Sequence, residues 1–323
     1  MNRPGFGSTN GLTVTVDGHV KPPALQVGDT IGVVAPASNI KLDMLREGCR
    51  ELESLGFKTY FRPDIVSSYR YLAGPRQRRL DEFLEMLRSR DIHAIFCARG
   101  GYGSGHLIPD IDPDVIRQNP KIVSGASDIT LLLNWIERAG VVSFHGPMVA
   151  TTIRQGNEGY DRQLLLDLLR GKQAVAFPTD GTTILRPGHG EGRLVGGCLS
   201  LLVSTLGTKN EIDTEDSILI IEDVDAKPYQ IDRMATHLKQ AAKFESVRGV
   251  VFGEMLNCLQ HPNQGYTLQE ILLDLLGEFA FPVLFGFATG HTSRPNVIVP
   301  FGVRARLALG TSARFELLEP AVV

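Results

Sequence analysis

The sequence predicts an α/β protein with a parallel sheet in its first half and a second, mixed α+β domain. Apolar, β-branched segments alternate with helix-period segments as far as about residue 170, and this rhythm then weakens. The expected strands of the first half lie at 30–35, 94–98, 122–124 and 141–144, with helices between them at 41–55, 77–88 and 129–139. Near-continuous apolar strands separated by helices are typical of a parallel sheet covered on both faces.

The second half of the chain predicts shorter strands and fewer helices. Strands are expected at 217–221, 249–252, 297–299, 304–309 and 313–318, and helices at 231–242 and 268–276. A segment rich in Thr, Gly and Pro separates the halves and indicates a linker. We therefore expect an amino-terminal extension, an α/β domain, a linker and a carboxy-terminal domain, at 1–23, 24–171, 172–187 and 188–323.

Composition excludes several classes of protein. The chain has 323 residues, 43% of them hydrophobic and 21% charged, which indicates a globular protein and excludes a disordered one. A net charge of −3 gives no reason to expect nucleic acid or an anionic membrane as a partner. The four cysteines form no CxxC pair and indicate reduced thiols. With neither an apolar signal region nor an 18-residue apolar run, the expected location is the cytoplasm.

A serine lies at a predicted strand-to-helix turn, in the segment KIVSGASDIT at 121–130. On such a turn Ser127 would be exposed at the carboxyl end of the sheet, beside the positive end of a helix. The nucleophile pattern G-x-S-x-G is not met, because Ile129 replaces the second glycine. A helix cap formed by Ser127 or Asp128 is the alternative interpretation of this segment.

A glycine-rich loop, ARGGYGSG at 98–105, follows another predicted strand. It lacks the GK[ST] ending of a phosphate loop and the full context of a dinucleotide motif, so no nucleotide cofactor is expected. Its backbone N–H groups are candidates for one side of an oxyanion hole, and a flexible turn is the alternative.

A carboxylate and a histidine complete the set of candidates. Glu222 ends a strongly apolar strand, where a carboxylate needs a partner such as a histidine N–H, whereas Asp223 begins the loop. His291 lies in a polar loop, 286–302. A solvated acid and a surface histidine are the alternatives. No histidine has the spacing of a metal site, so no metal is expected. Together these segments supply the parts of acyl-transfer chemistry.

The order of short motifs along the chain resembles the LD-carboxypeptidase family of serine peptidases. The resemblance extends from about residue 27 to residue 317. It rests on APAS at 35–38, LAG at 72–74, RGGYG at 99–103, GASDIT at 125–130, GPM at 146–148, LVGG at 194–197, LGT at 206–208, IEDV at 221–224, PY at 228–229 and GH at 290–291.

This resemblance implies a flavodoxin-like amino-terminal domain and a smaller, β-rich carboxy-terminal domain. It assigns the nucleophile to Ser127, the triad acid to Glu222 and the base to His291, so that the site lies between the domains. The backbone N–H groups of Gly101 and Asp128 would form the oxyanion hole.

The resemblance also implies a cytoplasmic homodimer that removes the terminal D-alanine from murein tetrapeptides, without a metal. Substrate-binding candidates are Arg79, Arg99 and Tyr102, and either arginine could pair with the terminal carboxylate. The sequence departs from the family at Cys198, where an asparagine is usual, and at Ala226, where many relatives carry glutamate. These departures leave the exact peptide open.

Two alternatives remain. One is a peptidase acting on a peptidyl-nucleotide of the microcin C type, which would favour an aromatic platform near the site, whereas Trp135 is expected in the core. The other is a binding module without turnover, which would have no use for Ser127, Glu222 and His291 together.

Overall fold

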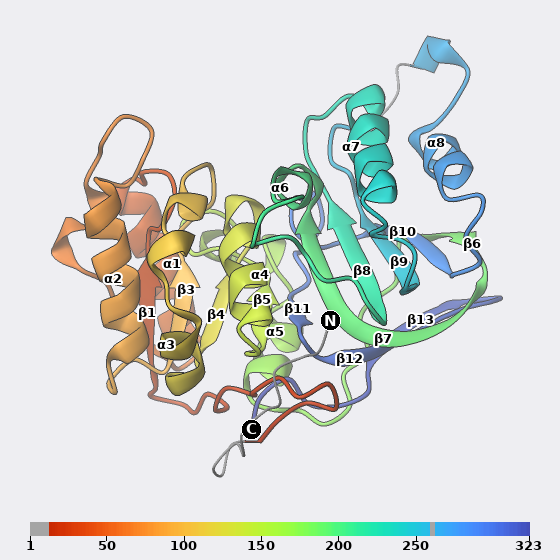
Figure 1. The fold of residues 1–323 in the computed structure, drawn as a ribbon. Coiled ribbons are helices and arrows are strands. Elements are labelled where there is room, and N and C mark those ends of the chain that lie inside the picture. The colour runs from red at the N-terminus through yellow and green to blue at the C-terminus, as the bar shows by residue number, and fades with distance from the viewer. Residues whose placement is uncertain (1–12, 259–261) are drawn as a thin grey trace.

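The computed structural model describes residues 13–258 and 262–323, so residues 1–12 of the predicted extension lie outside the described part. The chain forms two sheets with helices packed against them (Figure 1). The first sheet has the strand order β11-β5-β4-β3-β1-β2. Its strands are β1 (Thr30–Val34), β2 (Lys58–Tyr60), β3 (Ala94–Cys97), β4 (Ile122–Gly125), β5 (Ser143–His145) and β11 (Val299–Phe301).

Strands β1 to β5 are parallel to one another, and β11 joins β5 in the antiparallel direction. The order 2-1-3-4-5 is that of flavodoxin-like sheets, as predicted. Every residue of β3 and β4 is buried, which explains why both strands are apolar apart from Ser124. The α-helices of this half are α1 (Leu42–Ser54), α2 (Arg76–Arg88), α3 (Pro113–Gln118), α4 (Thr130–Arg138) and α5 (Arg162–Leu169).

The second sheet has the strand order β13-β12-β7-β8-β9-β10-β6. Its centre, β7 to β10, is parallel, and β6, β12 and β13 are antiparallel additions at the edges. The strands are β6 (Thr183–Arg186), β7 (Gly188–Cys198), β8 (Ser217–Glu222), β9 (Val247–Gly253), β10 (Val283–Phe287), β12 (Arg304–Leu309) and β13 (Ala313–Leu317). Helices α6 (Leu199–Ser204), α7 (Pro228–Gln240) and α8 (Leu268–Leu275) complete this half.

The two halves exchange segments across the predicted domain limits. Strand β11, from the carboxy-terminal part of the chain, completes the first sheet, and β6 lies inside the segment predicted as a linker. Val20 of the predicted extension is buried and bridges to Val141. Packing far along the chain creates these contacts, which local composition does not reveal.

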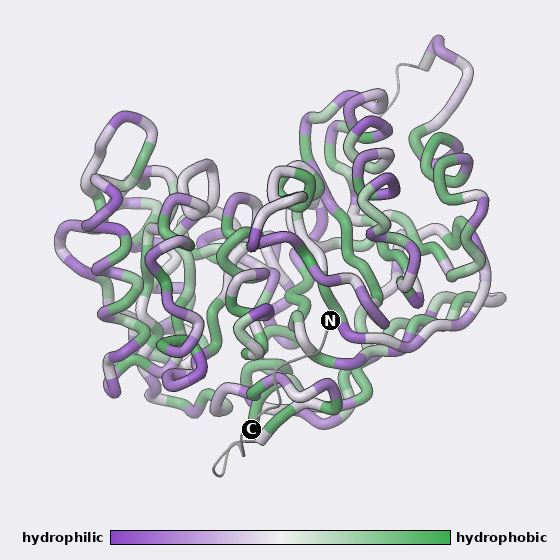
Figure 2. Tube along the Cα trace, in the orientation of Figure 1, coloured by the Kyte–Doolittle hydropathy of each residue, from purple (hydrophilic) through white to green (hydrophobic). Residues whose placement is uncertain are grey.

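Two hydrophobic cores support the sheets. The larger runs through the first sheet and on to β12 and β13, and the smaller lies beneath α6, α7 and α8. Figure 2 shows the strands of both sheets as mostly hydrophobic and the outer loops as hydrophilic. All four cysteines are buried and free, in line with the prediction of reduced thiols. Within the described ranges, no helix combines the length and apolar character needed to cross a membrane.

Candidate active site

Ser127 lies on a strained turn between β4 and α4. It begins the short 3₁₀ helix η4 (Ser127–Ile129) with a φ of 61°, a left-handed conformation that costs a non-glycine residue energy. A Cβ on Gly100 would lie 2.8 Å from the Ser127 Cβ, so only glycine allows the neighbouring loop to approach this closely. Ala126 is the cap residue and its side chain makes no capping hydrogen bond. No side chain therefore caps η4, and Ser127 lies half-buried on the turn.

The side chain of Asp128 ties this turn to the glycine-rich loop. Its Oδ2 accepts a hydrogen bond of 2.8 Å from the Ser104 N–H, and the Ser104 hydroxyl donates one of 2.6 Å to the Asp128 carbonyl. Asp128 is only 1% exposed. Both predicted oxyanion donors therefore belong to loops that are held to each other.

The two predicted donors have backbone groups suited to that role. Gly101 has a φ of 100°, which favours glycine, and a Cβ there would lie 2.4 Å from the Ser38 Oγ. Asp128 is in the first turn of η4, where N–H groups have no partner within the helix. These N–H groups could stabilise an oxyanion at Ser127.

Glu222 and His291 form a buried acid–base pair. The Glu222 Oε2 accepts two hydrogen bonds from His291, one of 2.8 Å from the ring Nδ1 and one of 2.9 Å from the backbone N–H. Glu222 is fully buried and the His291 side chain is 26% exposed, so the acid is shielded while the imidazole reaches solvent. This arrangement fixes the ring orientation and leaves Nε2 available as a base.

Two glycines leave room for the Glu222 side chain. A Cβ on Gly290 would lie 2.3 Å from the Glu222 Cδ, and one on Gly253 would lie 2.7 Å from the Glu222 Cβ. Gly290 also has a φ of 70°, so it serves both the turn and the close approach.

The pair changes the pKa of both groups. Burial alone would lower the pKa of His291, but the hydrogen bond and charge of Glu222, with Asp223 and Asp225 nearby, raise that pKa above its ordinary value. Burial alone would raise the pKa of Glu222, but the hydrogen bonds and charge of His291, with His145, lower that pKa. Glu222 therefore stays ionised and strengthens His291 as a base.

The loop that carries His291 is anchored by Glu254. This carboxylate accepts hydrogen bonds from Thr292, Ser293 and Arg294, of 2.6 to 2.8 Å. Burial alone would raise the pKa of Glu254, but these hydrogen bonds lower that pKa to about 2. Sequence analysis did not identify Glu254, because its partners lie almost forty residues further along the chain.

His145 is a residue of the site that sequence analysis did not identify. It ends β5, is fully buried, and stacks on Phe301 with ring centroids 5.5 Å apart. Its Nε2 lies 3.9 Å from the Glu222 Oε1, and neither of these two atoms has a hydrogen-bond partner among the described residues. Burial lowers the pKa of His145 to about 4, so the ring is neutral at pH 7. Its position at the end of a strand that neighbours β4 was the sequence feature that could have indicated a place near Ser127.

Two sets of contacts link the turn of Ser127 to the region of the acid–base pair. Gly125, just before the serine turn, is paired with His145, which faces Glu222. The Thr130 Oγ1, just after that turn, accepts a hydrogen bond of 3.1 Å from the Cys198 N–H. No hydrogen bond joins Ser127 to His291 in the described structure, as is common before substrate binds.

Cys198, where the family resemblance implies an asparagine, lies beside the acid–base pair. Its sulfur and the ligand atoms of Glu222 and His291 all lie within 4.8 Å of one another, and it contacts the Ser200 Oγ at 3.3 Å. Burial raises the pKa of the Cys198 thiol, so it is uncharged. Because Glu222 and His291 are hydrogen-bonded to each other, this pair suits acid–base chemistry better than metal binding.

The three candidate substrate-binding residues differ in environment. Arg79 is fully buried, and its Nη1 donates to the carbonyls of Pro36 and Gly103, so it supports the glycine loop from behind. Burial lowers the pKa of Arg79. Arg99 lines a cavity, and Tyr102 is 53% exposed and packs edge-on against Tyr71. Arg79 is thus part of the scaffold, whereas Arg99 and Tyr102 can be reached from solvent.

Comparison with known proteins shows the family of the chain. The family model of the LD-carboxypeptidase N-terminal domain matches residues 31–146, and that of the LD-carboxypeptidase C-terminal domain matches residues 191–307. The chain is 40% identical over 312 residues to the "Probable murein peptide carboxypeptidase" of Bacillus subtilis (strain 168), covering 94% of this chain and 95% of that protein. The chain belongs to the LD-carboxypeptidase family.

Other members of the LD-carboxypeptidase family are similar over most of their length. The "Microcin C7 self-immunity protein MccF" of Escherichia coli is 30% identical over 316 residues, covering 87% of this chain and 90% of that one. The crystal structure of an MccF-like protein from Bacillus anthracis str. Ames superposes with a TM-score of 0.84 at 24% identity, covering 92% and 99% of the two chains, which shows a shared fold. Family membership confirms the prediction of a serine-type hydrolase, while the residue roles remain predictions.

Proposed function

We propose that the chain is a serine carboxypeptidase that hydrolyses an L,D amide bond and releases the terminal D-alanine of murein tetrapeptides. The observation that carries this proposal is the buried Glu222–His291 pair, which the Gly125–His145 and Thr130–Cys198 contacts link to the strained turn of Ser127. The name of the Bacillus subtilis relative, a probable murein peptide carboxypeptidase, supports murein peptides as the substrate class.

The proposed reaction proceeds in two halves. In the first, the His291 Nε2 takes the Ser127 proton as the serine oxygen attacks the amide carbon, and then returns it to the leaving amine of D-alanine. The Gly101 and Asp128 N–H groups stabilise the oxyanion, and losing one such donor would cost about 3–4 kcal/mol of transition-state stabilisation. In the second, His291 takes a proton from the water that attacks the acyl-enzyme carbonyl, and gives this proton to the Ser127 oxygen as the tripeptide leaves with its new carboxylate. Throughout, the Glu222 carboxylate accepts the hydrogen bond from the His291 Nδ1–H.

The test is mass spectrometry of the purified protein incubated with a tetrapeptide ending in D-alanine, beside its all-L isomer and a Ser127→Ala control. We expect loss of one alanine from the D-terminal peptide alone, and none in the control. Cleavage of both isomers would refute the L,D preference, and continued cleavage by the control would refute the role of Ser127.

A second candidate keeps the chemistry and changes the substrate to a peptidyl-nucleotide. The 30% identity to the microcin C7 self-immunity protein favours it. Trp135 gives it no support, because the indole N–H donates to the Ile111 carbonyl at 2.9 Å and the ring packs against the core. The exposed Tyr71–Tyr102 pair is the aromatic surface next to the glycine loop. Hydrolysis of a peptidyl-adenylate analogue, with no release of D-alanine from murein peptides, would decide for this candidate.

A binding module without turnover is the third possibility. It would not explain why Ser127 is held in a strained conformation next to a buried acid–base pair. Labelling by a serine-reactive fluorophosphonate, absent in Ser127→Ala, would exclude it.

We further propose that the enzyme acts as a cytoplasmic homodimer, as its family resemblance implies. Sedimentation equilibrium of the full chain would measure the assembly, and fractionation of cells expressing it would locate the activity.

A further inference from the structure

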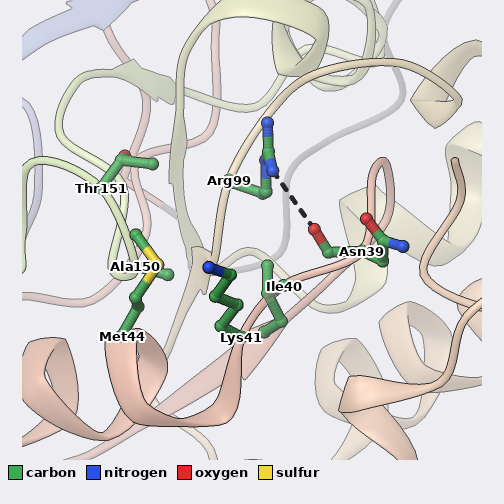
Figure 3. Close-up of a pocket in the computed structure, with 7 residues that line it drawn as sticks. All are labelled: Asn39, Ile40, Lys41, Met44, Arg99, Ala150 and Thr151. Atoms are coloured by element: carbon green, nitrogen blue, oxygen red, sulfur yellow. Dashed lines mark hydrogen bonds between the residues drawn. The ribbon is translucent and has the colours of Figure 1, made fainter.

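A cavity of 290 Å³ lies beside the glycine loop, lined by residues that include Asn39, Lys41, Met44, Arg99 and Thr151 (Figure 3). These residues follow different strands of the first sheet: 39 and 41 follow β1, 99 follows β3, and 151 comes after β5. Strands β1 and β3 are neighbours in the sheet, yet the chain leaves them toward opposite sides, to β2 and to β4. Such a switch point at the carboxyl edge is where open α/β sheets bind ligands.

The cavity carries two positive charges without an acidic partner. Figure 3 shows the Lys41 ammonium and the Arg99 side chain beside the same space. Arg99 makes one hydrogen bond, of 3.3 Å to the Asn39 carbonyl, and its Nε is buried without a partner. Within the described ranges, neither cation pairs with a carboxylate. Asp43, the acid of the nearby helix turn, does not line the cavity and is bonded to the Met44 N–H.

Lys41 also occupies a position where local helix chemistry disfavours it. It is the N-cap of α1 and makes no side-chain capping hydrogen bond. Helix N-caps favour Ser, Thr, Asp or Asn, and a cation near this end faces the positive end of the helix dipole. Lysine, arginine and helix dipole thus contribute charge of one sign to one cavity, and a bound anion would compensate all three.

Chain geometry places this cavity next to the nucleophile. Arg99 directly precedes Gly100, whose backbone packs against Ser127, and consecutive Cα atoms are only about 3.8 Å apart. In a peptide cut at its last bond, the terminal carboxylate is separated from the scissile carbonyl carbon by only the amide nitrogen and one α-carbon. We propose that this cavity, the Lys41–Arg99 pocket, binds the terminal carboxylate of the peptide substrate and makes the enzyme a carboxypeptidase. This inference rests on the proposed function.

The experiment uses the catalytically blocked Ser127→Ala protein, so that binding is measured without turnover. Isothermal titration would follow a tetrapeptide ending in D-alanine, its terminal amide, and an analogue with the internal D-glutamate carboxylate amidated. Each would be titrated with and without Lys41→Met. Because Lys41 is exposed, we expect the variant to fold, and a thermal melt would check this. Lys58→Met is the matched control: an exposed lysine that opens β2 at the opposite, amino edge of the same sheet.

We expect Lys41→Met to weaken binding of the free tetrapeptide at least tenfold and to leave binding of the terminal amide unchanged, with Lys58→Met neutral. An equal loss for the free peptide and the amide, or no loss for either, would overturn the inference. If instead Lys41→Met left only the affinity for the analogue with the amidated internal carboxylate unchanged, the pocket would hold that internal carboxylate, and the inference would be wrong. Release of D-alanine by the wild-type enzyme keeps the proposed function intact in each of these cases. If the tetrapeptide neither bound to Ser127→Ala nor lost D-alanine to the wild-type enzyme, both the proposed function and this inference would be wrong.

Discussion

Replacing Glu222 by glutamine tests the acid–base pair with almost no change of shape. The Glu222 Oε2 accepts hydrogen bonds of 2.8 and 2.9 Å from His291, and the acid is fully buried. A glutamine cannot supply a charge, and its NH₂ group cannot accept from either His291 nitrogen. Each hydrogen bond to a charged group contributes about 1.5–3 kcal/mol, so roughly 3–6 kcal/mol is at stake. A loss of about 10⁴-fold in kcat, or about 5.5 kcal/mol, lies within that range and matches the loss seen when a triad aspartate becomes asparagine.

The pH dependence of Glu222→Gln gives a second, independent readout. Glu222 raises the pKa of His291, and the proposed base must be neutral to act. Removing the carboxylate therefore lowers that pKa, and the acid limb of kcat/KM should move to lower pH even as the plateau falls. The assay is D-alanine release from pH 5 to 9 under kcat/KM conditions. A loss of less than tenfold, or an acid limb displaced to higher pH, would refute this account of Glu222.

Three further predictions follow from the same site. His145→Phe removes the neutral ring nitrogen that lies 3.9 Å from the Glu222 Oε1. The Glu222 charge then depends more on His291, which favours the protonated form of that imidazole. The acid limb of kcat/KM should then move to higher pH, the reverse of Glu222→Gln, and an unchanged profile would exclude the interaction. Gly290→Ala should reduce kcat at least 10²-fold, since its Cβ would lie 2.3 Å from the Glu222 Cδ, whereas Gly310→Ala, with no atom within 4 Å, should retain wild-type turnover. Dialysis against EDTA should leave D-alanine release unchanged, because the triad itself supplies nucleophile and base; a loss restored by zinc would contradict this.

The sequence predicted those parts of the fold that depend on local pattern. The predicted strand at 94–98 is β3 (Ala94–Cys97), and the helix predicted at 41–55 is α1 (Leu42–Ser54). Glu222 was predicted to be buried because it continues an apolar strand, and β8 does end with that residue.

Features that depend on distant contacts were not predicted. Strand β7 was missed because its glycines do not resemble a strand. A Cβ on Gly196 would lie 1.9 Å from the Ile220 carbonyl oxygen of the adjacent strand β8, and one on Gly190 would lie 1.9 Å from the Arg248 carbonyl oxygen of β9. The sequence also could not separate Arg79 from Arg99 as substrate ligands, because only tertiary packing buries Arg79 completely. His145 was not identified for a similar reason: its neighbour, Glu222, comes from the other sheet.

The pairing of β11 with β5 has a consequence for synthesis on the ribosome. Strand β5 emerges with the first half of the chain, and its outer edge stays open until residues 299–301 arrive. An open edge strand is a template for pairing with another chain, so the nascent protein is exposed to aggregation during this interval. Ser127 is likewise translated long before Glu222 and His291, and without them it has no base. With the proposed triad, this order of residues would keep a growing chain inactive until the end of its synthesis is near.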